Sequence, residues 1–111
     1  MSLRAPNQSI LMIHVVARAS IQPEMLDDYL KIVRALLPTV RAEDGCLRYE
    51  PCLDYAEDGS RAPYVTMLES WKSKVHLDAH LASAHMKAFI AKVSPMRLGK
   101  SELRILTSAE N

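Results

Sequence analysis

Three of the four histidines in this 111-residue chain, His76, His80 and His85, fall within one short segment. The imidazole is well suited to proton exchange at neutral pH, because its ordinary pKa is about 6.5. Ser83 stands between His80 and His85 and is a typical helix N-cap, so we expect a break between two helices there. Such a break would let the two imidazoles converge. We therefore take His80 and His85 as candidate catalytic residues, with packing or capping roles as the alternative.

A metal site is a second chemistry to consider. His76 and His80 are four residues apart and could face the same side of a helix, but no HExxH motif and no obvious third ligand follow. Cys46 and Cys52, on one strand, would be about 20 Å apart at roughly 3.3 Å per residue. That separation is too long for a disulfide, and there is no second cysteine pair for zinc. We predict no metal and no other cofactor, and free thiols in a reducing cytoplasm.

Glu69 and Trp71 are two residues apart at the end of a predicted strand, on one face. A carboxylate on an apolar face is unfavourable unless it is paired, and burial would raise its pKa into the range of a general base. Glu69 is therefore a candidate catalytic residue. The alternative is that it reaches solvent or an arginine, such as Arg18 or Arg48. Tyr49 could join the same pocket wall, where its hydroxyl would need a partner, or could be ordinary core.

We expect the remainder of such a pocket to be apolar and adaptable. Methionine side chains suit a flat aromatic ligand, although they suit plain core packing as well. The predicted substrate-binding residues are Tyr49, Trp71, Met12, His14, Met67, Met86 and Phe89. The sequence contains no GxGxxG motif and no P-loop, so it indicates no nucleotide site.

The elements that must position these residues alternate along the chain. β-branched residues predict strands at 10–19, 46–54, 64–71 and 102–107, and a helical repeat of apolar residues begins near Pro23 and is closed by Gly45. Pro38 should kink that helix or end its regular part. Leu47, Tyr49 and Leu53 should share one face of the second strand. Two shorter helices follow Ser73 and Ser83, each of which can act as an N-cap.

The order β-α-β-β-α-β predicts an α+β protein of the ferredoxin-like class, an antiparallel sheet with helices on one face. Both faces of the strand at 10–19 are apolar: Met12, His14 and Val16 point one way and Ile13 and Val15 the other. Helices can cover only one of these faces. We therefore expect a second copy of the chain to cover the other, which gives a homodimer and a dimeric α+β barrel. The alternative is a monomer with an open apolar face.

We expect one domain at residues 10–108, with a flexible arm at 1–9 and a tail at 109–111. The formal charge is only +1, which argues against nucleic acid as a partner. No apolar run approaches the roughly 20 residues that span a membrane, and no signal peptide is visible.

Together, these segments resemble the antibiotic biosynthesis monooxygenase superfamily, and most closely its bacterial quinol monooxygenase branch. The stretches that carry the resemblance are IHVVARASIQP, PTVRAEDGCLRYEP, LESWKSKVHLDAHLASAHMKAF and ELRIL, and they extend over roughly residues 11–106. The pattern E-x-W followed by H-L-x-x-H-x-x-S-x-H-M is its most specific part. The positions that match the family pattern are Gly45, Cys46, Tyr49, Glu69, Trp71, His80 and His85.

The resemblance implies a homodimer with one pocket per protomer between the sheet and the helices. It also implies oxidation of a quinol or related aromatic polyphenol by O₂ without flavin, metal or haem. Three alternatives stay open on the same scaffold: a haem-binding or haem-degrading protein, an isomerase of a small metabolite, and a dimeric ligand-binding protein without turnover.

Overall fold

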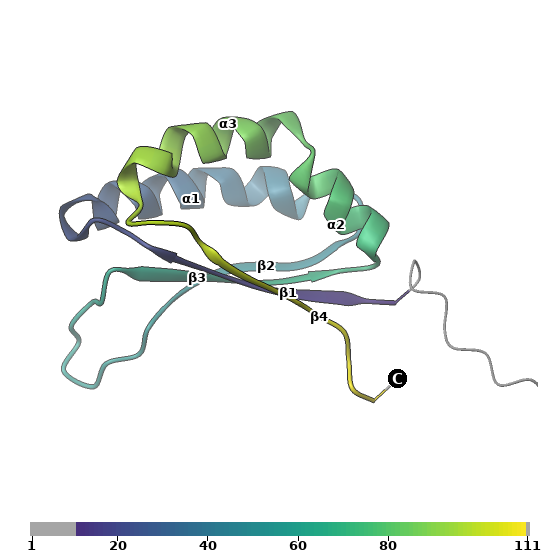
Figure 1. Ribbon diagram of the computed structural model, residues 1–111, viewed down its shortest axis with the longest axis horizontal. Helices are drawn as coiled ribbons and strands as arrows, with labels where there is room; N and C mark the ends of the chain where they lie inside the picture. The colour runs from purple at the N-terminus through teal and green to yellow at the C-terminus, as the bar shows by residue number, and fades with distance from the viewer. Residues whose placement is uncertain (1–10, 111) are drawn as a thin grey trace, which may run out of the picture.

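Four antiparallel strands form one sheet in the order β2-β3-β1-β4 (Figure 1). The computed structural model describes residues 11–110, so the predicted arm at 1–9 lies outside the described residues. The strands are β1 (Ile13–Ser20), β2 (Cys46–Leu53), β3 (Tyr64–Trp71) and β4 (Glu102–Leu106). β1 is central and pairs with β3 on one side and β4 on the other. The ferredoxin-like order expected from the sequence is confirmed.

All the helices lie on one face of this sheet (Figure 1). The helices are α1 (Leu26–Arg41), α2 (Lys74–Leu81) and α3 (Ala84–Val93), and short 3₁₀ turns occur at Pro23–Met25 and Ser94–Met96. The buried face of α1 packs against the sheet through apolar residues at helical spacing. Among the described residues, no helix is long and apolar enough to cross a membrane.

The break between α2 and α3 is built by serine caps. The Ser73 hydroxyl accepts from the His76 amide and begins α2, and the Ser83 hydroxyl accepts from the Met86 amide and begins α3. The Ser83 hydroxyl also donates to the carbonyl of His80, the last turn of α2. The chain therefore changes direction between the end of α2 and the start of α3.

The expected end of the regular helix at Pro38, one of two alternatives, and the expected placement of Leu47 are wrong. α1 does not end its regular part at Pro38 but continues to Arg41, because proline at an exposed position near the helix end leaves little hydrogen bonding to lose. Leu47 does not share the inward face with Tyr49. The register shifts between Cys46 and Arg48, and this bulge leaves Leu47 49% exposed.

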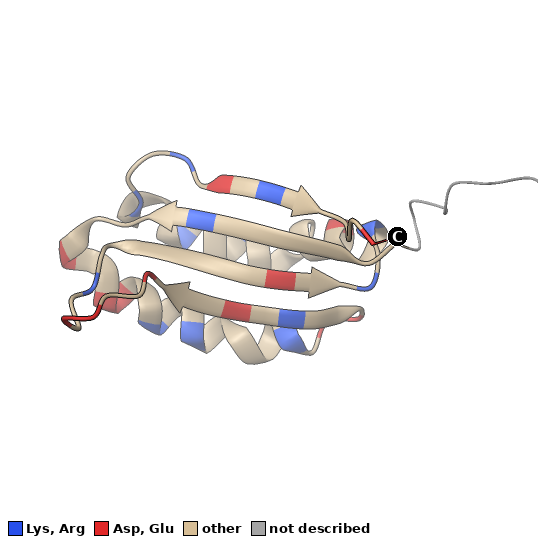
Figure 2. Ribbon diagram, turned by 90° about the horizontal axis from the view of Figure 1, so that it is seen from below, with Lys and Arg blue, Asp and Glu red and all other residues tan. Residues whose placement is uncertain are grey.

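Strand alternation separates the two faces of the sheet. Ile13, Val15 and Ala19 of β1 are buried beneath the helices. Val16, between them, faces the opposite side, which no element of the described chain covers (Figure 2). Figure 2 looks onto the sheet from this side, and strand register places five charged residues on this face: Arg18, Arg48, Glu50, Glu102 and Arg104.

Candidate active site

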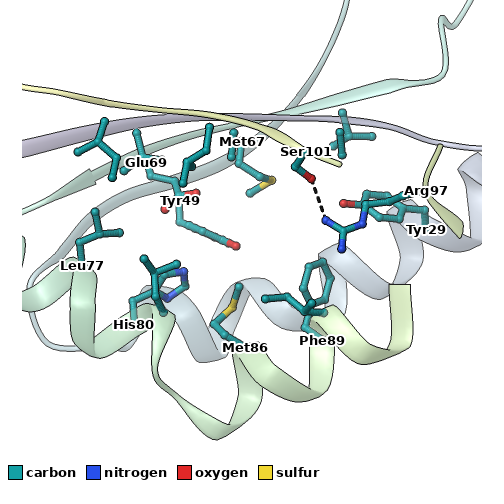
Figure 3. Close-up of a pocket in the computed structure, with 18 residues that line it drawn as sticks. Tyr29, Tyr49, Met67, Glu69, Leu77, His80, Met86, Phe89, Arg97 and Ser101 are labelled. Carbon is teal, nitrogen blue, oxygen red and sulfur yellow. Dashed lines mark hydrogen bonds between the residues drawn. The ribbon is translucent and has the colours of Figure 1, made fainter. Parts of the chain in front are cut away.

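An apolar pocket of about 140 Å³ lies between the sheet and the helices (Figure 3). A cavity of roughly 150 Å³ is large enough for a benzene ring. Strands β1, β3 and β4 supply one wall, and α2 and α3 supply the other. Polar groups are few and are placed at its ends, and they come from Tyr29, Tyr49, Glu69, His80, Arg97 and Ser101.

His80 is the most deeply buried of these polar residues, with its side chain 1% exposed. Its ring lies 4.5 Å from the Trp71 ring between centroids, at 33°, and the Tyr49 ring meets it edge-on at 5.5 Å. Its Nδ1 is 2.7 Å from Oε2 of Glu43. An ionised carboxylate can only accept, so Nδ1 carries the proton and donates. That tautomer leaves Nε2 as a proton acceptor for a ligand in the pocket.

Glu43 anchors the histidines from outside the pocket. Its side chain is 14% exposed, and its Oε2 also lies 3.0 Å from Nε2 of His85, whose side chain is 32% exposed. One carboxylate oxygen thus links a buried imidazole to a partly exposed one. Burial lowers the pKa of His80, and the hydrogen bond that its Nδ1–H donates to Glu43 opposes that effect. A neutral His80 held in one orientation is suited to accept a proton.

A tight turn places Glu43. Its amide donates to the carbonyl of Val40 and its carbonyl accepts from the amide of Cys46. Gly45 closes this turn with a φ of +79°, in the left-handed region that favours glycine. A Cβ at Gly45 would lie only 2.3 Å from the ring of His76. Glycine is therefore required at position 45 for two reasons: the backbone has a positive φ, and a side chain there would collide with His76.

Glu69 is the second titratable group in the pocket, 7% exposed, on the face of β3 beneath the helices. Its Oε1 accepts a hydrogen bond from Trp71 Nε1 at 3.0 Å. Burial raises the pKa of Glu69 to about 7, against the Trp71 hydrogen bond that lowers it, and the nearby Glu43 raises it further. Near neutral pH, Glu69 therefore exists in both forms and can accept or donate a proton. Burial also raises the pKa of Tyr49, so its hydroxyl stays protonated.

Glu43, His80 and His85 also form a set of possible metal ligands. One donor atom from each lies within 4.8 Å of the others. Two imidazoles and a carboxylate suit a first-row transition metal such as iron or zinc. In the structure, Oε2 of Glu43 hydrogen-bonds the ring nitrogens of both histidines.

The structure brings most of the predicted site residues together. Six of them line the pocket: Tyr49, Met67, Glu69, His80, Met86 and Phe89. Trp71 lies behind His80 as a stacking wall and is not part of the lining. The convergence expected of His80 and His85 is found, but it occurs on Glu43, and His85 lies outside the pocket.

Met12 and His14 must be corrected, because they do not reach the pocket. His14 lies on the uncovered face of the sheet, because the pocket is lined by odd-numbered residues of β1. Met12 precedes β1, is 44% exposed and does not line the pocket. Nδ1 of His14 instead hydrogen-bonds the hydroxyl of Ser70, which faces the same way on β3. The suggestion that Glu69 pairs with an arginine is also wrong. Arg18 binds Asp54 instead, and Arg48 binds Glu50.

Four polar residues of this region were not anticipated from the sequence: Glu43, Tyr29, Arg97 and Ser101. Glu43 follows the C-terminal end of α1, where a negative charge opposes the helix dipole. An acidic side chain at the C-terminal end of a helix therefore indicates that a group elsewhere in the fold binds and stabilises its carboxylate. Arg97 follows a proline-containing turn, and nothing in its sequence surroundings distinguishes it from a surface arginine.

Comparison with known proteins agrees with this geometry. Residues 12–92 match the family model described as antibiotic biosynthesis monooxygenase. A probable quinol monooxygenase of Escherichia coli, YgiN, is 45% identical over 69 residues, which cover 59% of this chain and 62% of that protein. The match thus spans less than two thirds of the relative's length. YcnE of Bacillus subtilis is 30% identical over 81 residues, covering 73% of this chain and 81% of that protein.

Solved structures show the same fold. A conserved protein from Methanosarcina mazei superposes with a TM-score of 0.78 at 29% identity, over 89% of this chain and 94% of that one. Rv0793 from Mycobacterium tuberculosis gives 0.78 at 24% identity, over 90% of this chain and 97% of that one. The family match extends over most of the domain and includes β1 to β3, α1, α2, nearly all of α3 and the His80 end of the pocket, whereas β4 lies beyond it. The chain therefore belongs to the antibiotic biosynthesis monooxygenase family.

Proposed function

We propose that the chain is a cofactor-independent monooxygenase that oxidises a quinol or a related aromatic polyphenol with O₂. The observation that carries this proposal is the arrangement of His80. A buried imidazole, fixed through Nδ1 by Glu43, presents its other nitrogen to an apolar pocket of aromatic size. The similarity to a relative named as a probable quinol monooxygenase supports the same chemistry.

The chemistry requires a base because O₂, a triplet, reacts slowly with neutral closed-shell molecules. A deprotonated quinol is a much better electron donor. Nε2 of His80 would take the quinol proton, and Glu43 would stabilise the imidazolium through Nδ1. Tyr49 and the protonated form of Glu69 would hydrogen-bond the oxygens of the bound ring. The apolar lining would exclude water.

The ionised quinol would then pass one electron to O₂, and the resulting radical pair would recombine at a ring carbon. Loss of water from the hydroperoxide completes the reaction. For 1,4-dihydroxynaphthalene the sum is one quinol and one O₂ giving one hydroxynaphthoquinone and one water. Release of quinone and hydrogen peroxide instead would make the protein an oxidase, so the products distinguish the two.

The test is O₂ consumption by the purified protein with 1,4-dihydroxynaphthalene, measured against a protein-free blank because quinols autoxidise. We expect uptake well above the blank, little O₂ returned on adding catalase, and one ¹⁸O atom in the product from ¹⁸O₂. His80→Asn should remove the increment over the blank. His14→Asn, on the other face of the sheet, is the matched control and should retain it.

Uptake equal to the blank over a panel of quinols would overturn the proposal. Binding of haem with a Soret band would then favour a haem protein. Turnover of a substrate under strict anaerobiosis would favour an isomerase. Tight quinone binding without any turnover would favour a ligand-binding protein.

We also propose that the uncovered sheet face joins two copies of the chain. Val16 pairs in register with Leu68 at the middle of this face. Of the arginines on this face, Arg18 is neutralised by Asp54 and Arg48 by Glu50, whereas Arg104 lies in register with Val16 and has no ion pair among the described residues. A face that would otherwise leave apolar side chains exposed, with its other arginines paired, suits an interface. Light scattering should give twice the monomer mass, and Val16→Glu should halve it.

The free thiols of Cys46 and Cys52 support a reducing compartment, the cytoplasm.

A further inference from the structure

Arg97 lines the pocket at the end away from His80 (Figure 3). Its Nη1 donates to the hydroxyl of Ser101 at 2.8 Å, and its Nη2 donates to the hydroxyl of Ser94 at 3.2 Å. Its backbone forms a bridge with Ile21, next to the end of β1. The guanidinium is therefore fixed in place by groups on both sides, and it is not a mobile surface side chain.

The charge of Arg97 has no counter-ion among the described residues. Its two hydrogen-bond partners are neutral hydroxyls, whereas Arg18 and Arg61 each hold an aspartate at 2.8 Å. Its Nε is buried and has no acceptor within the described part of the chain. A guanidinium beside an apolar cavity, fixed but unpaired, is suited to bind an anion there.

The two ends of the pocket thus differ in chemistry. At one end lie the proton acceptor His80 and the titratable Glu69, and at the other lie Arg97 and the Tyr29 hydroxyl (Figure 3). Between them the lining is apolar, from Met67, Phe89 and other side chains. A ligand that satisfies both ends carries a hydroxyl at one end of an aromatic system and an anionic group at the other.

We propose that Arg97 is a specificity-determining residue, and that the substrates are aromatic polyphenols carrying a carboxylate, which binds the guanidinium while the reacting hydroxyl faces His80. This inference rests on the proposed function for the identity of the reacting end. It adds a substrate class, the acidic quinols, and an orientation. A neutral quinol would leave Arg97 unpaired and would bind in more than one orientation.

The experiment measures binding without turnover. The probes are 4-hydroxybenzoate and 6-hydroxy-2-naphthoate, each compared with its neutral carboxamide by isothermal titration calorimetry. The two lengths allow for one ring or two between the ends of the pocket. In the native protein, the better-fitting acid should bind about ten-fold or more tightly than its amide, the scale of a charge-assisted hydrogen bond.

Arg97→Gln should abolish that preference while keeping the affinity for the amide, which shows that the pocket is still folded. Arg97→Lys should keep part of the preference, because the charge remains and the planar fork is lost. Arg34→Gln is the matched control, since Arg34 is an exposed arginine of α1 that lies neither in the pocket nor on the proposed interface. It should behave like the native protein.

Three results would overturn the inference: an equal affinity for acid and amide, a preference that survives Arg97→Gln, and no binding of any probe. If Arg97 instead pairs with a carboxylate of a second copy, Arg97→Gln would weaken dimerisation and leave the acid-to-amide ratio unchanged. Failure of the proposed function is separate. It would appear as absent O₂ uptake in a protein that still prefers the acid.

Discussion

Replacement of Glu69 by glutamine gives a prediction whose size can be worked from the structure. Glutamine keeps the acceptor for Trp71 Nε1 and cannot ionise. In the native protein, the pKa of Glu69 rises from 4.5 to about 7, mainly through burial. A carboxyl whose folded pKa is raised binds more protons when folded than when unfolded. The stability that it contributes is therefore present below pH 4.5 and is lost as the pH rises to about 7.

The magnitude follows from the same two values. Each pH unit between them lowers the free energy of unfolding by about 1.4 kcal/mol, so the full change is roughly 3 kcal/mol. Native protein and Glu69→Gln should therefore differ in a pH-dependent way. Relative to the native protein, the variant should gain roughly 3 kcal/mol between pH 4 and pH 8.

Chemical denaturation at a fixed protein concentration, from pH 4 to pH 8, measures this difference directly. Groups common to both proteins, including the histidines, cancel when the two curves are subtracted. Glu57→Gln is the control, because Glu57 is exposed in the loop between β2 and β3, away from the pocket and from the proposed interface, and should give a nearly flat difference. A flat difference for Glu69→Gln would refute the reasoning, since it would mean that the carboxyl is solvated or paired.

Three further predictions concern the site and its support. Glu43→Gln should lower kcat by about ten-fold or more with little change in KM, because glutamine keeps an acceptor for His80 Nδ1 but removes the negative charge that stabilises the imidazolium; steady-state O₂ uptake measures both constants. A rise in KM with an unchanged kcat would show a binding role instead. Gly45→Ala should destabilise the protein by about 1–3 kcal/mol more than Gly59→Ala in thermal unfolding. Both glycines have a positive φ, but only at Gly45 would the Cβ collide, with His76; equal effects would remove the steric argument. Exhaustive chelation, followed by metal analysis, should leave the proposed O₂ uptake unchanged, whereas loss that Fe²⁺ restores would assign the Glu43, His80 and His85 set to a metal.

Local chemistry in the sequence was enough to predict most of the fold. Alternating β-branched residues placed β3 at its observed bounds, Tyr64–Trp71. Ser73 and Ser83 predicted the starts of α2 and α3, because a capping hydroxyl acts on amides only two or three residues away. Both signals depend on near neighbours in the chain. The bulge at Leu47 depends on cross-strand register, which the local pattern does not encode.

The site was predicted less completely, for a related reason. Glu69, Tyr49 and His80 could be named because a polar group at an inward position stands out. Met12 was assigned to the pocket from its residue type, although strand alternation placed it with the residues of the other face. Glu43 lies 37 residues before His80, and their contact exists only because the loop after α1 comes beside α2. Long-range pairs of this kind follow from the fold and not from any motif.

The central claim is that His80 removes a proton from a bound quinol. It can be tested most directly without O₂, by anaerobic absorption spectra of 1,4-dihydroxynaphthalene titrated with protein at pH 7. The ionised quinol absorbs at longer wavelength than the neutral form. We predict that this band grows in proportion to occupied sites in the native protein and in His14→Asn, and is absent in His80→Asn that still binds the ligand. A bound quinol that keeps its neutral spectrum in the native protein, or an ionised one in His80→Asn, would contradict the account.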